Sequence, residues 1–155
     1  MAGLLEIVFE DVGKDVVLPL LEVIISDSES IVGAGCSEGF PVWSNGNIQL
    51  DSIRAAIEFD AAVSIFVNVQ NLKFTDISVK SALVRIVKYE DIFDLDISFD
   101  EEDAGLCSAD MVGDLFAYSK KINKQFKFVN CYFGMEPASD ETTRFFTNKV
   151  LGPLK

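Results

Sequence analysis

Oxygen-bearing side chains recur at every second position of one acidic stretch, and this spacing is compatible with calcium coordination. The series runs Asp94, Asp96, Ser98, Asp100 and Glu102. A calcium-binding loop also needs a glycine at its sixth position for a sharp turn and a bidentate glutamate at its twelfth. Phe99 and Gly105 stand at those two positions. We therefore predict no dedicated metal site in this stretch.

Other residues that could support catalysis lack a partner that the chemistry requires. Paired carboxylates hydrolyse glycosides when burial keeps one of them protonated, and nothing in the sequence marks a buried carboxylate. A thiolate at Cys36 would need a nearby histidine, lysine or arginine, and the chain contains no histidine. Cys36, Cys107 and Cys131 are widely spaced, so we expect reduced, mostly buried thiols. We predict that the protein is not an enzyme and uses no cofactor.

Three glycines, Gly33, Gly35 and Gly39, partly resemble a dinucleotide-binding loop because they follow an expected strand. Such a loop opens directly into a helix whose N-terminus holds the pyrophosphate. Here residues 40–43 read Phe-Pro-Val-Trp, and the third glycine comes one position late. The pattern therefore favours glycines at turns.

Size and composition indicate one acidic globular domain that spans residues 1–155, with a net charge of −12 and a pI near 4.3. Nucleic-acid binding needs clustered lysine and arginine, so this charge argues against it. The charge suits a basic protein partner, although it could equally serve only to keep the protein in solution. Residues 1–13 lack the basic region of a signal peptide, and charges interrupt every long apolar run. We expect a cytoplasmic protein without a membrane segment.

The acidic stretch belongs to a predicted β-hairpin, which would fix the direction of its side chains. Apolar and polar residues alternate strictly from Phe93 to Asp100, and Leu83–Tyr89 is also typical of a strand. Glu90 and Asp91 would form the turn, without the glycine that such turns prefer. The expected cross-strand pairs are Val84 with Ile97, Ile86 with Leu95, and Arg85 with Asp96.

This hairpin would present Asp94, Asp96 and Asp100 to water, followed by Glu101, Glu102 and Asp103. One arginine cannot neutralise so many carboxylates. A row of carboxylates on a rigid strand can imitate the phosphates of a nucleic acid and dock into the basic cleft of a nuclease. The alternative is a solvated sheet face without a partner.

The remaining pattern predicts an α+β fold, with a mostly antiparallel sheet and two or three helices packed on one face. Further strands are expected at Leu4–Phe9, in a short stretch that begins at Ile31, at Ala61–Val69 and, as the last strand, at Phe126–Phe133. A turn is expected at Asn45-Gly46 and a loop at Ser26–Ser30. Leu72–Lys80 is expected to be either an edge strand or a loop. A helix is expected at Val16–Ile25, capped by Asp15 with Pro19 in the first turn, and the alternative there is two short strands broken at Pro19. Further helices are expected at residues 52–59, capped by Asp51, and at Ser108–Lys121, capped by Ser108.

The segment Phe133–Glu141, which reads FGMEPASDE, and the nearby Thr143–Thr147 resemble the closing segments of small bacterial immunity proteins. These proteins are the antidotes of contact-dependent-inhibition and other polymorphic toxins. The resemblance implies neutralisation of a cognate toxin domain by tight, stoichiometric binding. It assigns no role to any single residue.

The sequence hypothesis is therefore an immunity protein that neutralises a cognate cationic toxin domain, a nuclease, by blocking its active-site cleft. The expected partner-binding residues are Asp94, Asp96, Asp100, Glu101, Glu102 and Asp103, with Tyr89 and Trp43 as aromatic anchors. The alternative is a non-catalytic structural or adaptor subunit of a bacterial assembly, which would use an apolar patch instead.

Overall fold

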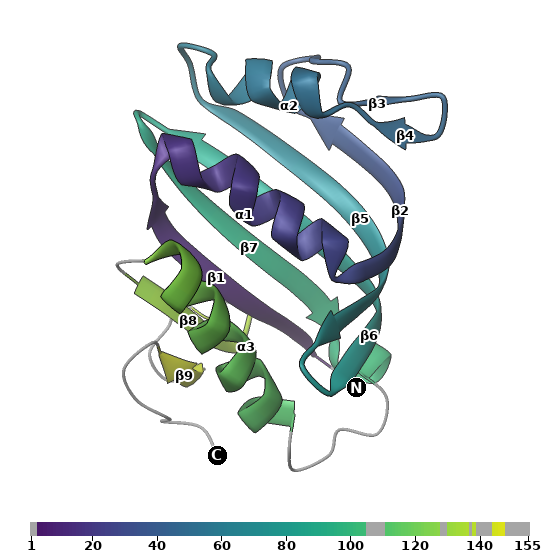
Figure 1. The fold of residues 1–155 in the computed structure, drawn as a ribbon, viewed down its shortest axis with the longest axis vertical. Helices are drawn as coiled ribbons and strands as arrows, with labels where there is room; N and C mark the ends of the chain where they lie inside the picture. Colours follow the sequence, from purple (N-terminus) through teal and green to yellow (C-terminus); the bar gives the residue numbers. More distant parts are fainter. Residues whose placement is uncertain (1–2, 105–110, 128–129, 137, 139–143, 148–155) are drawn as a thin grey trace.

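A seven-stranded antiparallel sheet organises the computed structural model, which describes residues 3–104, 111–127, 130–136, 138 and 144–147 (Figure 1). The strand order is β2-β5-β6-β7-β1-β8-β9. The strands are β1 (Leu4–Val12), β2 (Ser28–Cys36), β5 (Val63–Phe74), β6 (Ile77–Tyr89), β7 (Ile92–Asp100), β8 (Asn130–Met135) and β9 (Arg144–Thr147). A separate small hairpin joins β3 (Trp43–Ser44) to β4 (Asn47–Ile48).

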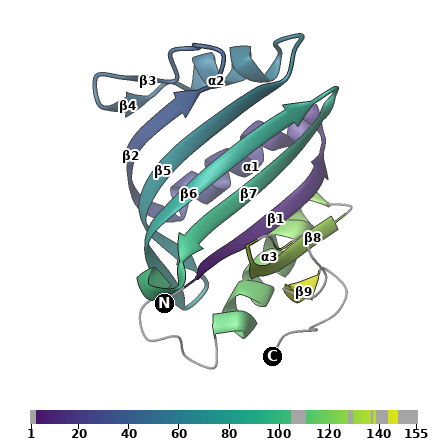
Figure 2. The same cartoon turned by 180° about the vertical axis from the view of Figure 1, so that it is seen from behind.

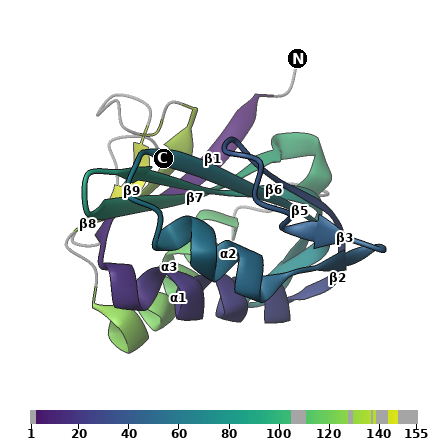
Figure 3. The ribbon, with the colours of Figure 1, turned by 90° about the horizontal axis from the view of Figure 1, so that it is seen from above.

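Three helices lie on one face of this sheet: α1 (Lys14–Ser26), α2 (Leu50–Ile57) and α3 (Met111–Phe126). Figure 3 shows them together on one side of β5, β6 and β7, and Figure 2 shows the opposite face, where β6 and β7 lie in front of α1. We call this opposite side, which none of these three α-helices covers, the open face. The predicted α+β class, with helices on one face of an antiparallel sheet, is confirmed. None of the helices within the described ranges is long and apolar enough to cross a membrane.

The core fills the space between the sheet and the helices with aromatic side chains. Phe93 and Phe99 are no more than 2% exposed, as the alternation along β7 predicts. Phe99 stacks on Phe133 with ring centroids 6.2 Å apart, and Phe74 meets Tyr118 of α3 edge-on at 5.0 Å. Because this side of each strand is covered, the polar positions of the same strands must face the open side.

The β6–β7 hairpin has the predicted register. Val84 pairs with Ile97, Ile86 with Leu95, and Arg85 with Asp96. Glu90 and Asp91 form the two-residue turn, and Glu90 adopts a left-handed backbone conformation with φ of 57°. The Asn45-Gly46 turn is also confirmed, between the paired residues Ser44 and Asn47.

Several predicted boundaries are wrong. The first helix begins at Lys14, because the Gly13 carbonyl accepts the amides of Val16 and Val17, and Asp15 makes no capping bond. Pro19 consequently lies in the second turn, on the exposed side, where water can reach the carbonyl that it leaves unpaired. The second helix begins at Leu50 after Gln49, so Asp51 is not its cap.

Several predicted strand and loop boundaries are also wrong. The predicted loop at Ser26–Ser30 is wrong from Ser28 onward, because β2 begins there. The predicted edge strand or loop at Leu72–Lys80 is instead the tip of the long β5–β6 hairpin. The last strand begins at Asn130, since Phe126 still belongs to α3, and β9 follows it as a further strand. The proposed cap Ser108 lies outside the described residues.

Candidate partner-binding site

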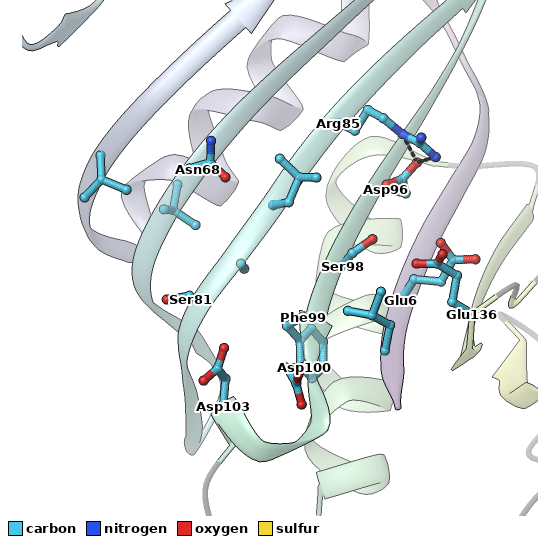
Figure 4. Close-up of a pocket in the computed structure, with 15 residues that line it drawn as sticks. Glu6, Asn68, Ser81, Arg85, Asp96, Ser98, Phe99, Asp100, Asp103 and Glu136 are labelled. Carbon is cyan, nitrogen blue, oxygen red and sulfur yellow. Dashed lines mark hydrogen bonds and ion pairs between the residues drawn. The ribbon is translucent and has the colours of Figure 1, made fainter. Parts of the chain in front are cut away.

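A broad hollow of about 850 Å³ lies on the open face, over β5, β6, β7 and β1 (Figure 4). The register brings its residues together in rows across the sheet. One row runs from Asn68 of β5 through Leu83 of β6 and Ser98 of β7 to Glu6 of β1. Each of these residues is opposite its neighbour and therefore points to the same side.

The two halves of the hollow differ in charge. The first half, on β2, β5 and β6, is lined by Val32, Asn68, Ser81 and Leu83, and we call it the uncharged half. The second half, on β7, β1 and the segments that follow β7 and β8, is lined by Glu6, Asp96, Asp100, Asp103 and Glu136, and we call it the acidic half. Arg85 lies at the boundary and is the one basic side chain among the residues that line the hollow.

Arg85 and Asp96 form the predicted ion pair across β6 and β7. The Nε and Nη2 atoms of Arg85 donate to Oδ2 of Asp96 at 3.1 and 2.9 Å. The Asp96 side chain is only 7% exposed, whereas that of Arg85 is 50% exposed. The prediction that Asp96 faces water is therefore wrong: it points to the open face but lies beneath the guanidinium. Burial raises the pKa of the Asp96 carboxyl above its ordinary value, although Arg85 opposes that shift.

Glu6 is a second buried carboxylate of the acidic half. The backbone amide of Ala138 donates to its Oε1 atom at 2.7 Å. Burial raises the pKa of the Glu6 carboxyl, the Ala138 amide opposes the shift, and the charges of Asp96 and Glu136 add to it. The sequence marked no buried carboxylate, whereas the structure buries two, Asp96 and Glu6.

Asp94 lies on the same face as Asp96 but nearer the turn, and its oxygens are engaged within the protein. The Tyr89 hydroxyl donates to both of them at 3.0 Å, and the Asp11 amide donates to Oδ1 at 3.2 Å. Tyr89 itself is exposed. Hydrogen bonds to Tyr89 and Asp11 therefore fix the Asp94 carboxylate at this end of the hairpin.

The acids after β7 form a short 3₁₀ helix, η1 (Glu101–Ala104), at the lower edge of the hollow. Asp100 Oδ1 accepts the Glu102 amide at 3.0 Å, which fixes this turn. Glu102 is exposed, while Asp100, Glu101 and Asp103 are half-buried. Asp100 and Asp103 line the hollow directly.

Trp43 does not lie on the open face. It belongs to the β3–β4 hairpin, pairs with Ile48, and lines a smaller hollow of about 320 Å³ together with Ile31 and Ser28 of β2. The structure therefore brings Tyr89, Asp94, Asp96, Asp100 and Asp103 onto one surface and leaves Trp43 on another.

Two acids of the hollow, Glu6 and Glu136, were not among the predicted site residues. Glu6 stands at a polar position between Leu5 and Ile7, so the alternation in β1 carried a signal for an outward side chain. Glu136 follows β8 in a turn-rich segment without any periodic pattern. Placing either of them next to Asp96 requires the strand order, which brings β1 between β7 and β8.

Nothing in the described parts of the chain forms a group of three or more His, Cys, Asp or Glu side chains arranged to hold a metal ion. Cys131 is a buried free thiol, and burial raises its pKa to about 12. Cys36 is a half-buried free thiol, and Cys107 lies outside the described residues. The interpretation of Cys131 as a buried structural thiol is confirmed.

Comparison with known proteins adds independent findings. The model of the PABL017 Cdi1I immunity protein family matches residues 3–151. A solved chain superposes with a TM-score of 0.87 and 31% sequence identity, and the match covers 100% of both chains. That chain comes from a 1.75 Å crystal structure of the toxic C-terminal tip of CdiA from Pseudomonas aeruginosa in complex with its immune protein. No curated protein matches the chain.

Proposed function

The chain belongs to the PABL017 Cdi1I immunity protein family, and on that premise we propose that it binds and neutralises the C-terminal toxin tip of a cognate CdiA protein. The family match covers residues 3–151, and the similar solved chain comes from a complex of a CdiA toxic tip with its immune protein. The protein acts by stoichiometric binding, and no reactive group is needed for this.

The acidic half of the open face supports a cationic toxin. Five carboxylates line that half, and the one arginine among the lining residues is already paired with Asp96. Such a surface accelerates the approach of a basic partner and discriminates against an acidic one. A toxin that cleaves nucleic acid needs a basic cleft for its substrate, and this row of carboxylates is suited to occupy that cleft.

The predicted contact residues differ in how accessible they are and in what holds them within the protein. Asp100, Glu102 and Asp103 have side chains that a partner can reach, and they supply the direct contacts in this proposal. Asp96 is buried beneath Arg85, and the half-buried Asp94 is held by the Tyr89 hydroxyl. Both carboxylates add to the negative electrostatic potential of the open face. Asp94 holds Tyr89 in position, and Asp96 holds Arg85. Glu101 lies at the same edge, and Trp43 would require a separate contact.

Co-expression with the CdiA C-terminal domain from the same strain tests the proposal. We expect the chain to restore growth, to form a one-to-one complex and to abolish nucleic-acid cleavage by the purified toxin domain. The association rate should fall steeply as salt rises from about 0.05 to about 0.5 M, because the Debye length shrinks several-fold over that range. Failure to bind would refute the function, and salt-independent association would refute its electrostatic part.

A further inference from the structure

The uncharged half of the hollow also exposes apolar side chains, which a purely electrostatic surface would not need. Val32 of β2 is 52% exposed, and Leu83 of β6 is half-buried beside it across β5. Large apolar side chains that gather on one face of a sheet mark contact surfaces more often than isolated ones do.

Phe66 extends this apolar region next to the hollow. Its side chain is 40% exposed, and its ring lies over Gly35 of the edge strand, so closely that a Cβ atom at Gly35 would come within 2.5 Å of it. The absence of a side chain at Gly35 therefore leaves room for the end of the Phe66 ring. Phe66 also pairs with Arg85, which places the aromatic ring beside the boundary of the acidic half.

The acidic half is under electrostatic repulsion in the free protein. Glu6, Asp96 and Glu136 line the same half of the hollow, and the pKa of Glu6 is raised first by burial and further by the charges of Asp96 and Glu136, which oppose its ionisation. A cation from a partner would relieve this repulsion. An apolar side chain bound at the acidic half would not relieve this repulsion.

We infer that the open face docks one segment of the cognate toxin, with apolar side chains against the uncharged half and lysine or arginine side chains against the acidic half. This inference rests on the proposed function and adds the chemistry of the segment. Charge complementarity selects the occupant: a second copy of this chain carries the same net charge of −12 and is repelled.

Two double variants separate the contributions of the halves to binding of the strain's own CdiA C-terminal domain. In Asp100→Asn with Asp103→Asn, the amide at position 100 can still accept the Glu102 amide, so the turn is kept. We expect the association rate to fall roughly three- to tenfold at low salt, with a shallower salt dependence. In Val32→Thr with Leu83→Thr, strand propensity is kept, and we expect the dissociation rate to rise about tenfold with an unchanged salt dependence.

The matched control is Asp15→Asn with Glu22→Gln, which removes two exposed charges from α1 on the opposite side of the sheet. We expect it to bind like the wild type at any salt concentration. If the wild type binds the toxin but both open-face variants bind equally well, the inference is wrong while the proposed function stands. If the free chain forms a dimer that Val32→Thr with Leu83→Thr abolishes, a second copy is the occupant and the inference is overturned. If the wild type does not bind the toxin, the proposed function fails with it.

Discussion

Lys88 is a buried cation on the core side of β6, where its neighbours alternate as apolar residues. It is 6% exposed, and its ammonium group donates to the carbonyls of Ile57, at 3.0 Å, and Phe59. These carbonyls lie at the C-terminal end of α2, where backbone acceptors have no partner within the helix and a positive charge is favourable. Lys88 thus links the C-terminal end of α2 to the sheet by hydrogen bonds, in addition to the buried apolar residues of that helix.

We expect Lys88→Met to lower the free energy of unfolding by about 1–3 kcal/mol, since the side chain still fills its space but leaves the buried Ile57 carbonyl and the partly buried Phe59 carbonyl without this donor. Urea denaturation measures the change. Lys80→Met, at an exposed position of the same strand, is the control and should change stability by no more than about 0.5 kcal/mol. Equal stability of the two variants would show that the ammonium group contributes nothing to closing α2.

At the scale of elements, the β6–β7 turn contains local strain that its sequence makes easy to remove. Glu90 has a φ of 57°, a conformation that costs a residue with a side chain about 1–2 kcal/mol, whereas glycine adopts it freely. We expect Glu90→Gly to stabilise the protein by about 0.5–1 kcal/mol, after the entropy that glycine loses on folding. The denaturation midpoint should rise with an unchanged slope.

The adjacent turn residue provides the matched control. Asp91 does not adopt a positive φ, so Asp91→Gly removes a similar charge but relieves no strain and should be neutral or destabilising. An equal gain from both substitutions would instead mean that loss of negative charge, rather than backbone conformation, stabilises the hairpin.

Elements with an uninterrupted alternation were predictable because one side of each strand is covered by helices. That is why the pattern from Phe93 to Asp100 gave the correct strand, faces and cross-strand pairs. The β5–β6 tip was not predictable in this way. Gln70 and Asn71 are exposed in succession, and Asn71 and Thr75 both have positive φ, so the two-residue period is broken there.

At the scale of the whole molecule, the sequence predicts those contacts of the candidate site that lie within one hairpin. It does not predict the contacts that depend on the strand order. The alternation in β7 identified Asp96 and its partner Arg85, since hairpin neighbours are also neighbours in sequence. It could not show that Glu6 and Glu136 join them. The same convergence explains why Asp96 is buried: neighbours from β6, β1 and the end of β8 enclose a position that the hairpin alone would leave in water.

This convergence of carboxylates predicts how stability depends on pH. In the folded protein the carboxyl pKa values of Glu6 and Asp96 are raised, so the native state binds protons more tightly than the unfolded chain. The contribution of these two groups to the free energy of unfolding should therefore increase as pH falls from neutral, and it is complete below their ordinary values of 4.5 for glutamate and 3.8 for aspartate.

Glu6→Gln isolates one carboxylate of this group. The glutamine oxygen can still accept the Ala138 amide, but the charge that opposes Asp96 and Glu136 is gone. We expect the variant to be more stable than the wild type at pH 7 and to gain less on acidification, so that the two stability curves converge near pH 4.5. Denaturant unfolding at a series of pH values, with the exposed Glu22→Gln as control, measures this difference. Parallel curves for the wild type and Glu6→Gln would mean that Glu6 ionises in the folded protein as it does in the unfolded chain, and that the acidic half is not under the repulsion that a toxin's cations would relieve.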